Sequence, residues 1–233
     1  MDVVHYLDRG DGTQLAYRRR RGRGPTLVFL PGYMSDMDGT KAQALDAWAA
    51  AEGRAMLRFD YAGCGLSGGD FEAQTLHGWR DDILAMIDRI AEGSVVLAGS
   101  SMGGWLMLLA ALARPERVAG LVGIAAAPDF TGWGFTDEQK LTILREGRLV
   151  EHSPYGEDPY VTTRAFWESG EALRLIDSYE PPDPPAIPFE PREGTGSGWT
   201  EVPRGMLWHR YAIDEATKGG QMELHPRPSG WLR

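Results

Sequence analysis

The stretch SVVLAGSSMGGWLMLLAALARP (residues 94–115) predicts a buried strand, a tight turn and a helix in succession. The continuous apolar run VVLA is typical of a strand covered on both faces. The helix after the turn must end near Pro115, because proline disfavours helical backbone in the residue before it. The turn itself, GSSMG, is built from small residues that let a helix approach neighbouring strands closely.

GSSMG fits the pattern G-x-S-x-G in one register only, with Ser101 at its centre. Centring the pattern on Ser100 would put Met102 at a position that needs a small residue. In a strand–turn–helix context the central serine stands on a strained turn with its hydroxyl accessible. We therefore predict that Ser101 is a nucleophile and Ser100 its variable neighbour. The alternative is a glycine-rich turn with an idle serine.

The segments around this stretch predict a mostly parallel central sheet with helices on both faces, because strands and helices alternate along residues 1–128. An Asp/Gly turn, DRGDG, lies between the alternating runs VVHYL and TQLAYRR and predicts an N-terminal hairpin. The other expected elements are strands at 26–30, 55–60 and 118–126 and helices at 41–53 and 75–93.

The pattern changes twice after residue 128. Residues 129–180 are expected to form a small helical lid without strands, in which Thr136 and Gln139 are spaced as a capping box. This lid is rich in aromatic residues, which either pack it onto the core or line a substrate site. Residues 181–233 hold nine of the fifteen prolines and form a divergent tail in place of the last core strands, which are therefore not assigned.

The composition of the chain argues against several classes of partner and location. The net charge of −9 argues against nucleic acid, because phosphate binding needs a basic surface. The basic run at residues 18–23 is interpreted as a solvated strand end or loop. The single cysteine, Cys64, excludes an internal disulfide. No stretch approaches the ~18 apolar residues of a membrane span, and the start MDVVHYLDRGDG has no signal-peptide core, so a cytoplasmic protein is expected.

A nucleophilic serine needs donors for the developing oxyanion. The backbone N–H of Met102, at the helix start, is one candidate. The loop after the strand at 26–30, PGYMSDMDG, offers a second in the N–H of Tyr33. The segment GCGLSG (residues 63–68) matches the dinucleotide fingerprint formally, but no helix begins in its glycines, so nucleotide binding is not expected. Neither a cofactor nor a metal is expected for the chemistry of a nucleophilic serine.

Three segments, LPGYMSDMDGTKA, FDYAGCGLSGG and GSSMGGWLML, together resemble the α/β-hydrolase fold. Within it they resemble the small serine esterases and thioesterases of the mitochondrial palmitoyl-protein thioesterase and mycophenolic acid acyl-glucuronide esterase family. The resemblance covers roughly residues 1–180. It implies Ser101 as nucleophile, Tyr33 and Met102 as oxyanion-hole residues, and an ester or thioester substrate, which the lid aromatics suggest is apolar. Animal members of the family carry a mitochondrial leader, which the start of this sequence lacks.

The tail departs from this family. The family acid lies in a G-x-x-D-x-x-V-P segment, but GSGWTEVPRG has Trp199 in place of the aspartate, and no histidine stands in the final RPSGWLR. Asp129 is the substitute candidate for the acid, and His209 and His225 are the candidates for the base because only they have the right chain order. We hypothesise that the C-terminal fifth is read out of frame or replaced relative to its relatives.

The sequence thus predicts a serine hydrolase of carboxylic esters or thioesters, small-molecule or acylated, that forms an acyl-serine intermediate. The alternative is a catalytically impaired or non-catalytic protein of the same fold, and a cofactor-free haloperoxidase or C–C hydrolase is a weaker one. The sequence leaves the oligomeric state open.

Overall fold

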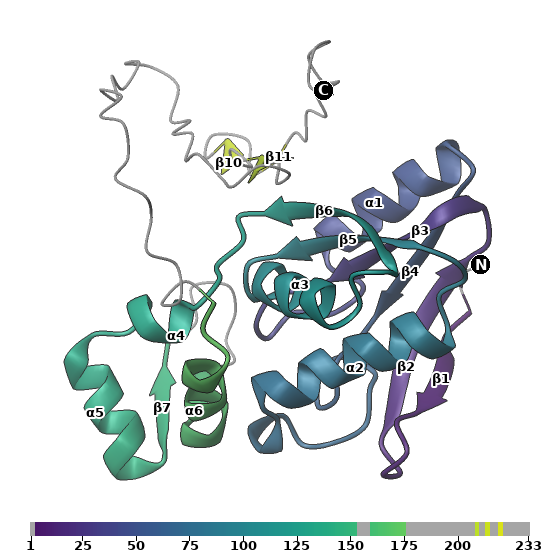
Figure 1. Cartoon of the computed structure of the whole chain (residues 1–233). Coiled ribbons are helices and arrows are strands. Elements are labelled where there is room, and N and C mark those ends of the chain that lie inside the picture. The colour runs from purple at the N-terminus through teal and green to yellow at the C-terminus, as the bar shows by residue number, and fades with distance from the viewer. Residues whose placement is uncertain (1–2, 153–158, 176–207, 210–212, 215–218, 221–233) are drawn as a thin grey trace.

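The computed structural model describes residues 3–152, 159–175, 208–209, 213–214 and 219–220 (Figure 1). Its centre is a seven-stranded sheet with the order β1-β2-β4-β3-β5-β6-β9. Strands β1 and β2 form the expected hairpin, β2 also pairs antiparallel with β4, and the remaining neighbours are parallel. The strands are β1 (His5–Asp8), β2 (Gln14–Arg20), β3 (Arg23–Leu30), β4 (Arg54–Phe59), β5 (Val95–Ser100), β6 (Val118–Ile124) and β9 (Trp208–His209). The mostly parallel sheet predicted from the sequence is confirmed.

Helices cover both faces of this sheet, as expected (Figure 1). Helix α1 (Thr40–Ala51) packs over β3 and β4, while α2 (Leu76–Arg89) and α3 (Met102–Ala113) lie together on the opposite face. A short 3-10 helix, η1 (Phe71–Ala73), precedes α2. Helix α2 starts where the sequence predicts, because the Thr75 hydroxyl accepts a hydrogen bond from the N–H of Gly78 at 3.1 Å.

Side chains of the buried strands alternate between two apolar cores. In β3, Val28 and Leu30 join the larger core under α2 and α3, and Leu27 and Phe29 join the smaller one under α1. This alternation follows from the two-residue period of a strand, so a segment buried on both faces reads as a continuous apolar run.

The segment after β6 that is expected to form a lid, called the lid below, contains both helices and strands. It comprises α4 (Phe130–Trp133), α5 (Asp137–Glu146), β7 (Arg148–Glu151), β8 (Tyr160–Thr163) and α6 (Arg164–Ala172). The capping box of Thr136 and Gln139 is confirmed. The expectation of no strands is wrong, because β7 and β8 pair antiparallel from Arg148↔Thr163 to Glu151↔Tyr160. Each strand has four residues, too few for alternation to be recognised beside strong helical patterns.

The tail contributes backbone to two sheets. Strand β9 extends the main sheet beside β6, and β10 (Ile213–Asp214) pairs with β11 (Gly219–Gly220). These two-residue strands carry no periodic pattern, which explains why the sequence did not predict them. The rest of residues 181–233, and with it the hypothesis of a changed reading frame, lies outside the described residues.

The arginines of β2 are paired rather than merely solvated. Arg18 bonds to Asp38 at 3.0 Å and Arg20 to Asp46 at 2.9 Å, and Arg58 on β4 bridges both carboxylates. Arg58 has a side-chain exposure of only 7%, so these acids compensate a buried charge. The basic run therefore joins β2 to the α1 region instead of forming a free basic surface.

No helix in the described part of the chain is long and apolar enough to cross a membrane.

Candidate active site

Ser101 lies at the turn between β5 and α3, with φ 53° and ψ −120°. A non-glycine residue adopts such a positive φ only where the surrounding structure enforces it, at a cost of about 1–3 kcal/mol. Strand β6 and the residues after it provide this enforcement. The N–H of Ser101 donates to the Ile124 carbonyl at 3.1 Å, and its own carbonyl accepts from the N–H of Ala127 at 3.0 Å. Ser101 is exposed at the carboxyl end of the central strand β5, while Met102 beside it is buried.

The glycines around Ser101 are required by backbone contact. A Cβ on Gly99 would overlap the carbonyl of Gly103, and a Cβ on Gly103 would overlap the carbonyls of Leu30 and Pro31. Gly104, which follows the five-residue pattern, would meet Ala126 in the same way. The pattern therefore explains two of the three close approaches, and sequence reasoning missed the third.

The loop after β3 lies directly against the serine turn. A Cβ on Gly32 would stand 3.4 Å from the Cβ of Ser101. The N–H of Ser35 donates to the Gly32 carbonyl at 3.2 Å, which closes a tight turn with Tyr33 and Met34 in its centre. Met34 has φ 53°, the left-handed value that the third residue of such a turn needs. The two predicted oxyanion-hole residues are thus on the two segments that flank Ser101.

The backbone N–H groups of Tyr33 and Met102 have no acceptor among the residues that the structure describes. For Met102 this follows from its place in the first turn of α3, where N–H groups lack a partner within the helix. Unpaired N–H groups beside an exposed serine hydroxyl are what an oxyanion hole requires.

The candidate acid Asp129 is buried and accepts bonds from the lid. Both oxygens of its carboxylate accept from the N–H of Leu175 at 2.9 Å, which joins the start of α4 to the segment after α6. Its φ of 55° is in the left-handed region that aspartate tolerates better than most residues.

The candidate bases are only partly described. The backbone of His209 is in β9 and pairs with Ile124, whose carbonyl holds Ser101. His225 lies outside the described residues. His5 stacks on Tyr17 at 5.4 Å between ring centroids, and the Nδ1 of His77 lies 2.9 Å from the Ser169 hydroxyl of α6. The histidines whose side chains the structure describes are His5, His77 and His152, and none of these three hydrogen-bonds to Ser101.

A family model described as the alpha/beta hydrolase family matches residues 27–228. The chain belongs to the alpha/beta hydrolase family. The match includes both segments of the site and extends into the tail.

Individual members of this family are similar to the chain over about three quarters of its length. Human palmitoyl-protein thioesterase ABHD10 is 41% identical over 179 residues, which are 75% of this chain and 58% of the relative. The solved structure of mouse alpha/beta hydrolase domain-containing protein 10 is 38% identical with a TM-score of 0.69, over 75% of this chain and 72% of that one. A putative hydrolase from Agrobacterium vitis S4 is 35% identical with a TM-score of 0.70, over 76% and 74%. The chain spans about half the length of the curated relatives it matches.

The expected cytoplasmic location is contradicted by these relatives. The human, bovine and rat thioesterases that match are all named as mitochondrial proteins. The error came from judging location by the first residues alone, whereas the similarity that bears on location runs through the folded part of the chain.

Two buried carboxylates in this alpha/beta hydrolase were missed by sequence reasoning. Asp60, after β4, accepts from the N–H groups of Met37 at 2.7 Å and Leu66 at 2.8 Å, and burial raises its pKa. Asp82, on α2, accepts from the N–H of Ala62 at 2.9 Å, and burial raises its pKa to about 6. The first has a sequence signal, an aspartate between a buried strand and the glycine-rich turn of residues 63–68. The second resembles any polar residue of an amphipathic helix.

An aromatic cluster joins the lid to the core, with Tyr33 at its centre. The ring of Tyr33 lies 4.8 Å from Phe166, 6.1 Å from Tyr160 and 6.3 Å from Phe130, which come from α6, β8 and α4. On the core side it lies 5.5 Å from Phe71 and 5.9 Å from Trp79. Phe166 is only 2% exposed, so it packs the lid on the core, as one of the two interpretations of the lid aromatics proposed.

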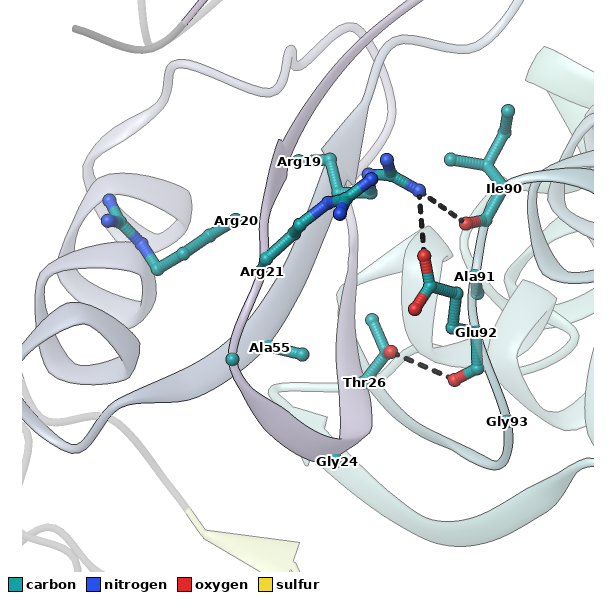
Figure 2. A pocket seen from close by; sticks show the side chains of 11 residues that line it. Arg19, Arg20, Arg21, Gly24, Thr26, Ala55, Ile90, Ala91, Glu92 and Gly93 are labelled. Carbon is teal, nitrogen blue, oxygen red and sulfur yellow. Dashed lines mark hydrogen bonds and ion pairs between the residues drawn. The ribbon is translucent and has the colours of Figure 1, made fainter.

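A cavity of about 330 Å³ lies elsewhere in the molecule (Figure 2). Arg19 of β2 and Arg21, which directly follows that strand, point into it, whereas Arg20 points to the opposite side of the strand. Gly24, at the amino end of β3, and Gly93, two residues before β5, also line it, whereas Ser101 follows the carboxyl end of β5. A six-residue strand separates these edges by roughly 20 Å. This cavity is therefore not part of the Ser101 site.

Proposed function

We propose that this chain is a serine hydrolase of carboxylic esters or thioesters with apolar acyl groups. The observation that carries the proposal is the strained, exposed Ser101 between two segments with unpaired N–H groups. The thioesterases among its relatives support the thioester class, and their names specify palmitoyl-protein substrates for those proteins.

In this proposal the Oγ of Ser101 attacks the acyl carbonyl while the base takes the hydroxyl proton. The C–O or C–S bond then breaks, the base returns the proton to the leaving oxygen or sulfur, and an alcohol or thiol departs. The N–H groups of Tyr33 and Met102 stabilise the oxyanion, and each such donor is worth about 10²–10³ in rate. Water then attacks the acyl-serine ester and releases the acid. The half-buried aromatics Phe130, whose ring lies 6.3 Å from that of Tyr33, and Phe135, 6.3 Å from Phe130, are the apolar surface that we assign to the acyl chain.

The serine also needs a base and an orienting acid. Of the two candidate histidines, His209 has the better support, because β9 is the strand next to β6. Asp129 is the candidate acid, and in this role it would accept from the histidine in addition to the Leu175 N–H, to which both of its oxygens are bonded.

A fluorophosphonate probe tests the nucleophile, since it forms a covalent adduct with an activated serine. Wild type should be labelled and Ser101→Ala should not. Ser100→Ala is the matched control, because Ser100 is the adjacent serine and is buried at the end of β5. Labelling that persists in Ser101→Ala rejects the assignment.

A second candidate is a catalytically impaired member of the family. The observation that favours it is that none of His5, His77 and His152, the histidines with described side chains, hydrogen-bonds to Ser101. Without a base the hydroxyl stays protonated, and turnover would fall to about the 10³–10⁴-fold acceleration over water that binding and an oxyanion hole supply alone. Turnover of p-nitrophenyl butyrate and octanoate by folded protein decides between the two, because only the armed serine gives rates typical of esterases.

A further inference from the structure

The side chain of Tyr33 is held by the lid, although its backbone belongs to the loop beside Ser101. Its phenol donates a hydrogen bond of 2.5 Å to the carbonyl of Val161 in β8. Its ring contacts Phe166 of α6 at 4.8 Å between centroids, the shortest of its ring contacts.

The backbone of Tyr33 lies in a turn that is tied to the serine on its other side. Gly32 packs against Ser101, and Met34 adopts a positive φ. A strained turn persists only where neighbouring contacts over-determine it. Those contacts include the hydrogen bond from Ser35 to Gly32 that closes the turn and the contacts of the Tyr33 side chain with the lid.

We infer that Tyr33 is a positioning residue through which β8 and α6 of the lid set the place of a backbone N–H in the oxyanion hole. The catalytic part of this inference rests on the proposed function. The mechanical part, that the lid holds the 31–34 loop through Tyr33, does not.

The physical basis is the stiffness of the link. A tyrosine has two side-chain torsions, so fixing both its ring and its hydroxyl leaves the backbone little freedom. Oxyanion donors must lie within about 2.7–3.1 Å of the oxyanion, and a misplacement of about 1 Å can cost 10²-fold in rate. Burial also raises the pKa of the Tyr33 phenol, so the hydroxyl stays a donor across the working pH range.

The first test is Tyr33→Phe, which keeps the ring and the backbone N–H and removes the hydroxyl with its hydrogen bonds to Val161 and Thr162 of β8. Hydrogen–deuterium exchange should rise at least about threefold in peptides covering residues 31–38 and 160–166, consistent with the loss of one hydrogen bond. Tyr17→Phe is the matched control, because it removes the hydroxyl of a half-buried tyrosine on β2, away from β8 and α6, and should leave exchange at 31–38 unchanged. Wild-type exchange at 31–38 in Tyr33→Phe overturns the inference.

A second variant perturbs the link from the lid side. Phe166→Leu removes the ring packed on Tyr33 and leaves the sequence of the loop unchanged. Hydrogen–deuterium exchange should rise at 31–38 as well as in α6. If exchange rises in α6 alone, the lid does not hold the loop. A thermal unfolding scan of each variant shows that the comparison is made on folded protein.

Kinetics test the catalytic part. Tyr33→Phe should lower kcat about 3- to 10-fold, the equivalent of one hydrogen bond, with KM within about twofold, because the donor acts in the transition state. A raised KM with unchanged kcat overturns the positioning role. If wild type shows neither turnover nor Ser101-dependent labelling, the proposed function fails, and the exchange experiment still decides whether Tyr33 links the lid to the loop.

Discussion

Gly103→Ala should destabilise this protein although it places alanine in a helix. A Cβ at Gly103 would stand 2.5 Å from the Pro31 carbonyl and closer still to that of Leu30, where real Cβ atoms keep at least 3.0 Å. Both obstacles are backbone atoms, one at the end of β3 and one directly after it, so α3 must move away from them by more than 0.5 Å, the difference between 3.0 Å and the 2.5 Å distance to the farther carbonyl. Such overpacking costs about 1–3 kcal/mol.

Gly78→Ala is the matched control, because Gly78 is also in the first turn of a helix. Its added Cβ would stand 3.5 Å from the Thr75 hydroxyl, an ordinary contact. This variant should gain about 0.5–1 kcal/mol from helix propensity. The same gain offsets part of the clash at Gly103, so Gly103→Ala should lose about 1–2 kcal/mol net and the two variants should differ by about 2 kcal/mol.

Urea denaturation measures both free energies of unfolding, and turnover measures the displacement of the site. Gly103→Ala should also lower kcat by up to about 10²-fold, because the movement shifts Ser101 relative to Tyr33. If Gly103→Ala is as stable as Gly78→Ala, the close contact between α3 and the loop after β3 is wrong.

Other expected outcomes concern carboxylates and the tail. Burial raises the pKa of Asp82 to about 6 in the folded protein, against 3.8 in the unfolded chain. The neutral carboxyl therefore stabilises the fold below pH 3.8, and this contribution of about 3 kcal/mol is lost as pH rises through 6. Asp82→Asn should flatten that slope in urea titrations between pH 4 and 6, and an unchanged slope would contradict it. Asp129→Ala should cost about 1–3 kcal/mol by removing the carboxylate that accepts from the Leu175 N–H, measured by thermal unfolding. Asp129→Asn keeps an acceptor for the Leu175 N–H and should be as stable as wild type. Loss of turnover in this stable variant would therefore identify Asp129 as the catalytic acid. Sequencing the encoding DNA tests the frame hypothesis for residues 181–233, which fails if neither other frame restores D-x-x-V-P and D-H segments.

The elements with strong local patterns could be predicted from the sequence. The run VVLA, the Thr75 cap and the capping box at Thr136 each carry their information within a few residues, and each is confirmed. The strands of the lid were missed because four-residue segments carry too little periodicity.

The candidate site was predictable only where its chemistry is local. The G-x-S-x-G pattern located Ser101 because the glycines and the serine are neighbours in the chain. Asp82 was out of reach, because its role depends on Ala62, which a different segment supplies. The hold of the lid on Tyr33 joins residues 128 positions apart, and no local pattern records such a contact.

The bond between Asp129 and Leu175 has a consequence for how this family diversifies. It joins residues 46 positions apart, so the lid leaves and re-enters the body of the protein at one point. The contacts that fix Ser101 are complete by Ala127, before the lid begins. A segment with adjacent ends can be exchanged as a cassette with little disturbance of its host. Swapping this one would keep the serine turn intact but replace the residues of β8 and α6 that hold Tyr33, so in the proposed mechanism a new lid would change the acyl-binding surface and the position of one oxyanion donor together.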